Sequence, residues 1–436
     1  MPDSKKVLLI APYFIPRRRV GSLRPFKFAI HLSSLGYKPI VLTIGHRPDL
    51  LTPKERLLLG SIEILSIDSP LDRTSKSKKI GKTSDRNKKS VIESFLTWVD
   101  RNCPTDTWIS LFILRWKWIK RVVTDCNPDL IMATGDPWSG LWLGEKLSKK
   151  LHIPFIADFR DPWTLSNIRL RERSFFSAGV DKIIERKVVE SADRLIFTSQ
   201  QTNALYSEKY KIPSSKTATL YNSFEPVLMK KKIENSKLPV WDPDMVNILF
   251  LGCFRRLSSA AAILDILKNF QSSHPKEIRM LRIHSFGEPE KDEIENIKHA
   301  GFTSLFVFHD PFEPEESLPI MNSADLLLLS TSKERSDIIP AKLWDYLFSD
   351  VPILSIIPNP EVGKIVRNRN AGVHFSPENV HEIVDFLLRV ILAKQTGNDL
   401  PAPIRKDVDG IQQYTSKAAT NKLVTIFDDL LNTDQN

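Results

Sequence analysis

The segment Ser336–Ser355 reads SDIIPAKLWDYLFSDVPILS and combines a helix start, two spaced acids and an apolar run. Pro340 suits the first turn of a helix, because a backbone donor is not needed there. Asp337 and Asp345 are separated by seven residues. The apolar run at Val351–Ile356 predicts a buried strand. A helix whose free N–H groups can hold an anion, followed by a buried strand, is typical of an α/β fold.

Short apolar runs alternate with helical patterns on both sides of this segment. Runs of four to six apolar residues between helices indicate parallel sheets that are covered on both faces. Helices are expected at Leu23–Leu35, Ser139–Leu151, Asp181–Ser191 and Val380–Ala393. The expected strands are Val7–Ala11, Pro39–Ile44, Ile62–Ile67, Leu130–Thr134, Phe155–Asp158, Arg194–Thr198, Asn247–Leu251, Met280–His284, Ser304–Phe308, Ala324–Leu329 and Val351–Ile356.

The βα pattern runs through the chain twice, which predicts two domains for its 436 residues. A polar stretch with two prolines interrupts the pattern and is expected to be a linker at 230–245. The first domain is expected at 1–229 and the second at 246–400. A last helix at 411–431 is expected to pack back on the first domain. Open sheets of this type bind ligands at the carboxyl ends of their strands.

Composition limits the classes of protein that fit. The three cysteines, Cys103, Cys126 and Cys253, have neither disulfide-like nor metal-like spacing, which favours a reducing compartment. The net charge is +10. The stretch from Leu71 to Arg121 carries 13 Lys and Arg against 5 Asp and Glu. Such a cluster indicates either an anionic partner or a solvated loop.

The segment quoted first resembles the donor-binding segment of glycosyltransferase family 4, whose members usually carry Glu at both acidic positions. The resemblance implies a GT-B architecture, in which two Rossmann-like domains face each other across a cleft. It also implies that Asp345 holds the donor ribose and that Asp337 contacts the sugar. Lys342 would add a point charge for the donor phosphates.

The run GCFRR at 252–256 follows an expected strand and resembles the Gly…Arg turn that opens the second GT-B domain. Gly252 would let the backbone approach a ligand closely. The resemblance implies that Arg256 clamps the leaving diphosphate in a bidentate way. The second positive charge would come from Arg255 or Lys342.

Three further loops resemble ligand-binding loops of the same family. Gly287, in SFGE, and Asp310 and Phe312, in HDPF, follow two strands of the second domain. The resemblance implies contacts from these loops to the nucleobase and the phosphates. In the first domain, Gly21 and Arg24 resemble the flexible glycine loop near the acceptor and the donor phosphates. An ordinary turn is the alternative for each of the two loops of the second domain.

The run ADFRDPW at 157–163 places two carboxylates and an arginine at the carboxyl end of a strand. Acid–base and acceptor-binding groups belong at such an edge. The run resembles the Asp-x-Arg-Asp-x-Trp segment of bacterial members of the family. We expect Asp161 to face the acceptor or act as a base, with Arg160 as its charge partner and Asp158 beside them. The alternative is a structural ion pair.

Trp108–Val123 reads WISLFILRWKWIKRVV and predicts an amphipathic helix. Such a helix can lie in a membrane interface or pack on the first domain. No apolar run approaches the roughly 20 residues that a spanning helix needs. We therefore expect a cytoplasmic protein, with peripheral contact to the inner face of the plasma membrane as an option.

The resemblance implies a hexosyltransferase that uses a nucleotide sugar and retains anomeric configuration, in surface-polysaccharide or lipid-linked glycan synthesis. No metal and no further cofactor are expected, because the nine histidines lack ligand spacing. Two alternatives stay open. One is a nucleotide-sugar epimerase. The other is a silent scaffold, because Asp337 and Asp345 replace Glu and Ala261 stands where the family often has Lys. Nucleic-acid binding lacks a recognition motif.

Overall fold

The computed structural model describes residues 4–17, 20–60, 62–68, 98–99, 101–166, 173–229, 239, 241–256, 258–331, 335–403 and 408–433. The basic run at 73–89 and most of the expected linker lie outside these residues. The chain divides into two compact units, Met1–Tyr221 with Ser416–Asn436, and Asn222–Thr415. The first division, after Tyr221, comes before the expected linker. Each unit is described by itself below.

The first unit is built on a parallel sheet of seven strands in the order β3-β2-β1-β4-β5-β6-β7. Its central strands are apolar runs that are buried on both faces, as in LIMAT of β4. The strands are β1 (Lys5–Ile10), β2 (Tyr37–Ile44), β3 (Glu63–Ile67), β4 (Leu130–Gly135), β5 (Phe155–Phe159), β6 (Arg194–Phe197) and β7 (Thr217–Thr219).

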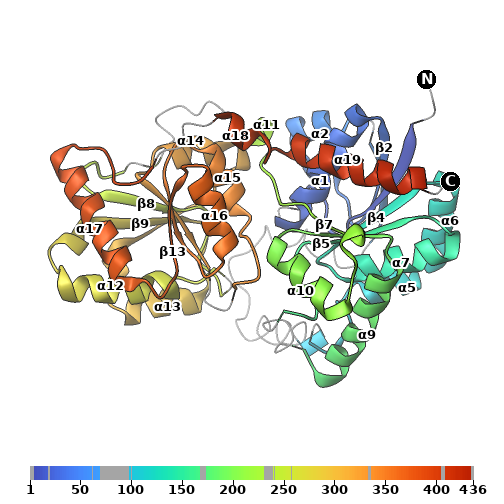
Figure 1. Ribbon diagram of the computed structural model, residues 1–436, viewed down its shortest axis with the longest axis horizontal. Helices are drawn as coiled ribbons and strands as arrows, with labels where there is room; N and C mark the ends of the chain where they lie inside the picture. The colour runs from blue at the N-terminus through green and yellow to red at the C-terminus, as the bar shows by residue number, and fades with distance from the viewer. Residues whose placement is uncertain are drawn as a thin grey trace. The chain divides into compact units, whose positions relative to one another are not determined.

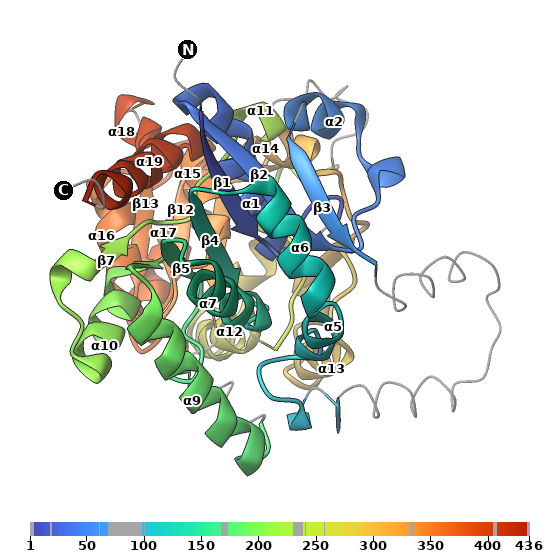
Figure 2. The same cartoon turned by 90° about the vertical axis from the view of Figure 1, so that its right-hand side faces the viewer.

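Helices cover both faces of this sheet (Figures 1 and 2). One layer holds α1 (Val20–Leu32) and α19 (Ser416–Thr433), which pack against each other. The hydroxyl of Tyr37 donates a 2.5 Å hydrogen bond to Asp428 of α19. The C-terminal helix is therefore part of the first unit. The other helices are α2 (Pro53–Leu59), α5 (Ile109–Leu114), α6 (Trp116–Cys126), α7 (Ser139–Leu151), α9 (Phe175–Ser191) and α10 (Gln200–Tyr210).

The prediction of a single amphipathic helix at 108–123 is wrong, because a turn at Arg115 divides this segment into α5 and α6. Phe112 of α5 and Ile119 of α6 are buried in the core of the first unit. The side chains of Ile113 and Leu114 are exposed. One face of the pair thus packs on the first unit, as one of the two sequence interpretations held.

The second unit has a parallel six-stranded sheet in the order β10-β9-β8-β11-β12-β13. The strands are β8 (Val246–Phe250), β9 (Leu281–Phe286), β10 (Phe306–His309), β11 (Leu326–Ser330), β12 (Ile353–Ile356) and β13 (Gly372–Phe375). The helices are α11 (Pro226–Met229), α12 (Ala261–Ser273), α13 (Lys291–His299), α14 (Ser317–Asn322), α15 (Lys342–Phe348), α16 (Pro360–Asn368), α17 (Val380–Thr396) and α18 (Val408–Gln412).

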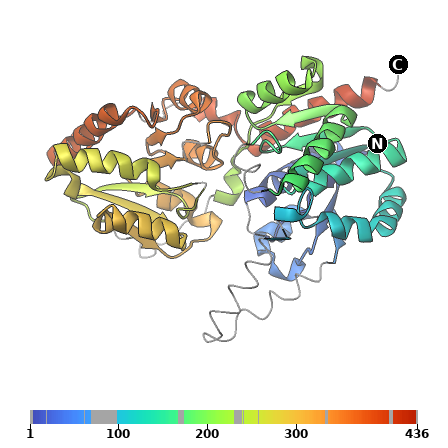
Figure 3. The ribbon, with the colours of Figure 1, turned by 90° about the horizontal axis from the view of Figure 1, so that it is seen from below.

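The helices of the second unit also form two layers. Figure 3 shows α17, in orange-red, beside α12, in yellow, and the two helices pack against each other. The helices α14, α15 and α16 lie together on the opposite face (Figure 1). The apolar side chains between the layers form one continuous core, with Phe250 and Leu328 on central strands. The arrangement is doubly wound in both units.

The strand order reverses direction at one point in each sheet. In the first sheet this point lies between β1 and β4, and in the second between β8 and β11. Ligands of open α/β sheets bind at the carboxyl ends of the strands beside such a reversal. The loops that follow these strands therefore carry the candidate site residues.

Candidate active site

Gly252 lies two residues after the end of strand β8 and has a φ of +97°, a conformation that favours glycine. Lys342, the first residue of α15, reaches this place from the other side of the strand reversal. A Cβ atom on residue 252 would lie 3.6 Å from Cε of Lys342. The structure therefore brings together two residues that lie 90 positions apart and that the sequence assigned to one diphosphate.

The ammonium group of Lys342 lies in an apolar setting. Its Nζ atom is 3.6 Å from the centre of the Phe250 ring. Burial lowers the pKa of Lys342 to about 7, the nearby Cys253 thiol opposes this shift, and the charge of Arg255 adds to it. A half-buried cation with a lowered pKa gains much from an anion, because the anion favours the charged form.

Arg255 and Arg256 lie on the turn after β8, and both side chains are exposed. The Nε atom of Arg255 donates to Sγ of Cys253 at 3.1 Å. The backbone N–H of Arg256 donates to the carboxylate of Glu290 at 2.9 Å, which fixes the turn. The structure places both arginines on the turn beside Gly252.

The loops after β8, β9 and β10 are tied together by backbone hydrogen bonds. Phe286 donates to the carbonyl of Gly252 at 3.0 Å, and Gly287 donates to the carbonyl of His309 at 2.9 Å. Gly287 has a φ of +95°. The rings of Phe286 and Phe312 meet edge to face at 5.0 Å. Exposed Asp310 follows β10 directly. The loops after β8, β9 and β10 thus lie together at the carboxyl edge of the second sheet.

The two acids of the segment quoted first differ in their surroundings. Asp337 forms an ion pair with Arg335, with 3.6 Å between the carboxylate and Nε. Asp345 lies in the first turn of α15 and is half-buried. The helix begins at Lys342 and spans seven residues. Trp344, in the same helix, is buried in the core.

In the first unit, Arg24 and Asp158 are fully engaged with each other. The guanidinium donates to the two carboxylate oxygens at 3.0 and 2.9 Å, and both side chains are buried. Arg24 also donates to the carbonyls of Leu220 and Tyr221, and Thr134 donates to Asp158. The sequence analysis did not foresee this buried ion pair, and the phosphate contact of Arg24 and the catalytic role of Asp158 stay predictions.

Arg160 is held chiefly by the backbone. Its Nε atom donates to the carbonyl of Gly135 at 2.9 Å, and its guanidinium would collide with a Cβ on Gly21. Burial lowers the pKa of Arg160, and the charges of Asp136 and Asp161 oppose this shift in that order. The expected pairing of Arg160 with Asp161 is therefore shared with Asp136. A Cβ atom on residue 21 would force this guanidinium to shift.

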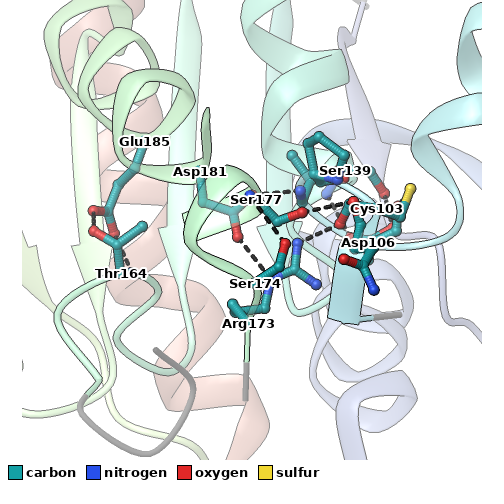
Figure 4. A network of polar contacts seen from close by, with 12 residues as sticks. Cys103, Asp106, Ser139, Thr164, Arg173, Ser174, Ser177, Asp181 and Glu185 are labelled. Atoms are coloured by element: carbon teal, nitrogen blue, oxygen red, sulfur yellow. Dashed lines mark hydrogen bonds and ion pairs between the residues drawn. The ribbon is translucent and has the colours of Figure 1, made fainter. Parts of the chain in front are cut away.

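Asp161 lies on the loop after β5, and this loop is anchored by Glu185 of α9 (Figure 4). The buried Glu185 carboxylate accepts hydrogen bonds from both the backbone N–H and the hydroxyl of Thr164. It also accepts from Tyr206 and Tyr210. Burial raises the pKa of Glu185. The loop that carries the candidate base is thus fixed by a buried acid.

The Trp163 side chain fixes the same loop from the other side. Its ring stacks on that of Trp138 at 5.3 Å between centres, with 4° between the ring planes. Its backbone N–H donates to the Tyr206 hydroxyl at 2.8 Å. Both tryptophans are buried. These contacts hold Asp161 at the carboxyl edge of the first sheet.

A second buried acid organises the start of α7 (Figure 4). Asp106 accepts hydrogen bonds from the backbone N–H and the hydroxyl of Ser139 at 2.8 and 2.7 Å. Burial raises the pKa of Asp106 to about 6. Nearby, Arg173 bridges Asp181 and the carbonyl of Cys103. The sequence analysis missed these residues, because acids within helical patterns read as solvated faces.

In the described part of the chain, no group of three or more His, Cys, Asp or Glu side chains could hold a metal ion. None of the helices in this part is long and apolar enough to cross a membrane.

Comparison with known proteins gave one family match and several solved structures of similar fold. Residues 27–226 match the sequence profile described as Glycosyltransferase Family 4. No curated protein matches the chain. Sucrose-phosphate synthase of Thermosynechococcus elongatus is similar in structure with a TM-score of 0.67 at 12% identity, covering 98% of this chain and 100% of that one.

Two further solved structures share this fold. HepE of Anabaena, solved in complex with UDP, has a TM-score of 0.62 at 13% identity, covering 98% of this chain and 100% of that one. A protein of Listeria monocytogenes assigned as a UDP-N-acetylglucosamine 2-epimerase has a TM-score of 0.51 at 11% identity, covering 98% and 96%. The chain therefore has the two-domain, Rossmann-like GT-B fold, and its residues 27–226 are similar to the Glycosyltransferase Family 4 profile.

Proposed function

We propose that the chain transfers a sugar from a nucleotide-sugar donor to an acceptor hydroxyl. The observation that carries the proposal is the meeting of Lys342 with Gly252 at the carboxyl edge of the second sheet. A cation of lowered pKa beside an open glycine, with two arginines on the next turn, suits a diphosphate. The structure of HepE with UDP supports this choice of ligand by fold similarity.

In the proposed reaction, the bond between the anomeric carbon and the diphosphate oxygen breaks, and the acceptor oxygen bonds to that carbon. Arg256 and Lys342 stabilise the negative charge that develops on the leaving diphosphate. The acceptor hydroxyl loses its proton, and Asp161 is the candidate base on the first unit. Asp345 would bind the ribose and Asp337 the sugar. Binding of both substrates in one orientation supplies much of the rate increase.

Finer assignments are part of the same proposal. The family resemblance supports retention of anomeric configuration, a hexosyl donor and an acceptor from surface-polysaccharide or lipid-linked glycan synthesis. A cytoplasmic chain at the membrane surface, with no metal requirement, fits that setting. The exposed Ile113 and Leu114 on α5 suit contact with a membrane surface.

Thermal-shift binding of purified protein against nucleoside diphosphates and nucleotide sugars tests the proposal. We expect one nucleotide family to raise Tm in the wild type and to lose this effect in both Arg256→Ala and Asp345→Ala. Protein that is folded but is stabilised by none of these ligands would contradict the proposal and favour a silent scaffold.

A nucleotide-sugar epimerase is the second candidate, because the Listeria protein shares the fold at a TM-score of 0.51. The two activities differ in their need for an acceptor. An epimerase interconverts nucleotide sugars in the absence of an acceptor, whereas a transferase releases nucleoside diphosphate with an acceptor present. Product analysis by NMR with the donor alone separates them.

A further inference from the structure

Two histidines in the second unit form a hydrogen-bonded chain that ends at the proposed donor edge. His284 lies on β9, the strand beside the edge strand β10, and His309 is the last residue of β10. Nδ1 of His284 and Nε2 of His309 are 3.0 Å apart, and Nε2 of His284 is 3.1 Å from Oδ1 of Asn247. His309 begins the run HDPF, which the sequence analysis compared with a ligand-binding loop, whereas His284 was not singled out.

The hydrogen bonds of Asn247 set the direction of this chain. Its Nδ2 atom faces only acceptors, the carbonyls of Asp242 and Met245 at 2.9 and 3.1 Å and the Asp325 carboxylate at 3.4 Å. The oxygen Oδ1 therefore faces His284 and must accept from it. His284 then carries its proton on Nε2.

The next link follows from the charge state of His284. This ring is buried, and the Trp241 ring packs edge to face against it at 4.2 Å. A buried imidazole stays neutral, because burial disfavours its charged form. Burial and the neighbouring His309 lower the pKa of His284 to about 3. Its Nδ1 atom is therefore an acceptor, and His309 must donate to it from Nε2.

His309 is thereby fixed as one tautomer. Burial lowers the pKa of its half-buried ring, so the ring is neutral at neutral pH, with the proton on Nε2 and a lone pair on Nδ1. Within the described part of the chain, no donor reaches Nδ1 of His309. The position offers one oriented hydrogen-bond acceptor to a ligand.

The surroundings of His309 suit a flat heterocycle. Its ring stacks on Phe286 at 4.7 Å, and the half-buried Phe312 contacts the same phenylalanine. β10 lies two strands from β8 in the sheet, so His309 is about 10 Å from the end of β8 at strand spacings of roughly 4.8 Å. That span matches the distance from the diphosphate of a nucleotide to the edge of its base.

We propose that His309, held by His284 and Asn247 as an acceptor, selects a donor nucleobase that presents a ring N–H. Uracil and guanine present such a group, whereas cytosine and adenine present a ring-nitrogen acceptor at the corresponding position. With cytosine or adenine, the ring nitrogen and Nδ1 of His309 would both be acceptors and neither would receive a hydrogen bond, which disfavours these two bases. This inference rests on the proposed function, since it specifies the donor of that same site.

Calorimetric titration of the full chain with UDP, CDP, GDP and ADP tests the inference. If the site takes pyrimidines, we expect UDP to bind about tenfold more tightly than CDP. If it takes purines, we expect GDP to bind about tenfold more tightly than ADP. In His309→Phe, which keeps an aromatic ring on Phe286, this preference should fall to about threefold or less. His299→Phe, at an exposed position on α13, is the matched control and should keep the full preference.

Two measurements avoid reliance on a variant. N3-methyl-UDP, or the N1-methyl form of GDP, should bind the wild type about tenfold more weakly than its parent. Nitrogen-15 NMR of the histidine rings should show Nδ1 of His309 without a proton. Tighter binding of CDP or ADP, an unchanged preference in His309→Phe, or a protonated Nδ1 would overturn the inference and leave the proposed function standing. Folded wild type that binds no nucleoside diphosphate would overturn both.

Discussion

Arg24 of α1 and Asp158 of β5 are joined by two hydrogen bonds of 3.0 and 2.9 Å, 134 residues apart in the chain. The pair connects the helix layer to the sheet, and Arg24 also holds the carbonyl of Tyr221, the last residue before the second unit. A buried charge left without its partner is costly. The pair therefore stabilises the fold, whereas the sequence analysis assigned both residues to substrate binding or catalysis.

Asp158→Asn should lower the free energy of unfolding of the first unit by about 3 kcal/mol, because it leaves a buried guanidinium without its counter-charge. Urea denaturation followed by circular dichroism measures the change. Asp125→Asn, at an exposed site on α6, should have little effect. The double variant Arg24→Met/Asp158→Leu should lose less stability than the sum of the losses in Arg24→Met and in Asp158→Leu, since it removes both charges. Full additivity would contradict a direct pair.

Lys342→Met should weaken binding of the preferred nucleoside diphosphate at least tenfold, because it removes the cation beside Gly252. Calorimetric titration gives the affinity. Lys364→Met, at an exposed position on α16, serves as the control and should bind as the wild type does. Equal affinities for the Lys342 variant and the wild type would remove Lys342 from the diphosphate site.

The lowered pKa of Lys342 also predicts a pH effect on stability. The folded chain loses this proton near pH 7, whereas the unfolded chain keeps it until about pH 10.5. Between these values the unfolded state binds more protons, so this group's contribution to stability rises with pH. The stability of the wild type relative to Lys342→Met should therefore increase from pH 7.5 to pH 9.5. A constant difference across this window would contradict the shift.

Bound diphosphate should raise the pKa of Lys342 and so take up a proton. Titration at pH 8 in two buffers of different ionisation enthalpy measures this uptake. We expect a positive uptake in the wild type that is lost in Lys342→Met. Zero uptake by the wild type would show that the ammonium does not face the diphosphate.

Arg256→Ala should lower kcat about 100-fold with a smaller effect on KM, because charge develops on the diphosphate mainly in the transition state. Initial rates with the donor identified by thermal shift give both constants. Arg279→Ala, an exposed change in the same unit, is the control. A large loss in Arg255→Ala with none in Arg256→Ala would assign the clamp to the neighbouring arginine.

Glu185→Ala should destabilise the first unit by about 3 kcal/mol, because it leaves the donors of Thr164 and two tyrosines unpaired in the core. Thermal denaturation measures the loss, and Glu190→Ala, exposed on the same helix, should be nearly neutral. Glu185→Gln keeps an acceptor and should fall between the two. A Glu185→Ala variant as stable as the wild type would contradict the anchoring role.

The elements of the sheets could be predicted because their signal is local. The expected helix at Ser139–Leu151 has the same bounds as α7, and the expected strands match β1 to β6 within a few residues. β7 and β13 were missed, since Thr217–Thr219 and Gly372–Phe375 are short and only partly buried. The break at Arg115 was missed because the apolar pattern continues through it.

For the candidate site, too, local features were predicted from the sequence and distant partners were not. The sequence by itself determined the doubly wound α/β fold and the loops that carry Gly252, Lys342 and Asp161, because periodicity and turn residues act over a few positions. Only the tertiary structure decided that Asp158 belongs to Arg24, that Glu185 anchors the loop of Asp161, and that His309 is held by His284. These partners are 21 to 134 residues apart. No local pattern encodes their burial in a common core, and that burial decides which charged groups pair and which groups keep their protons.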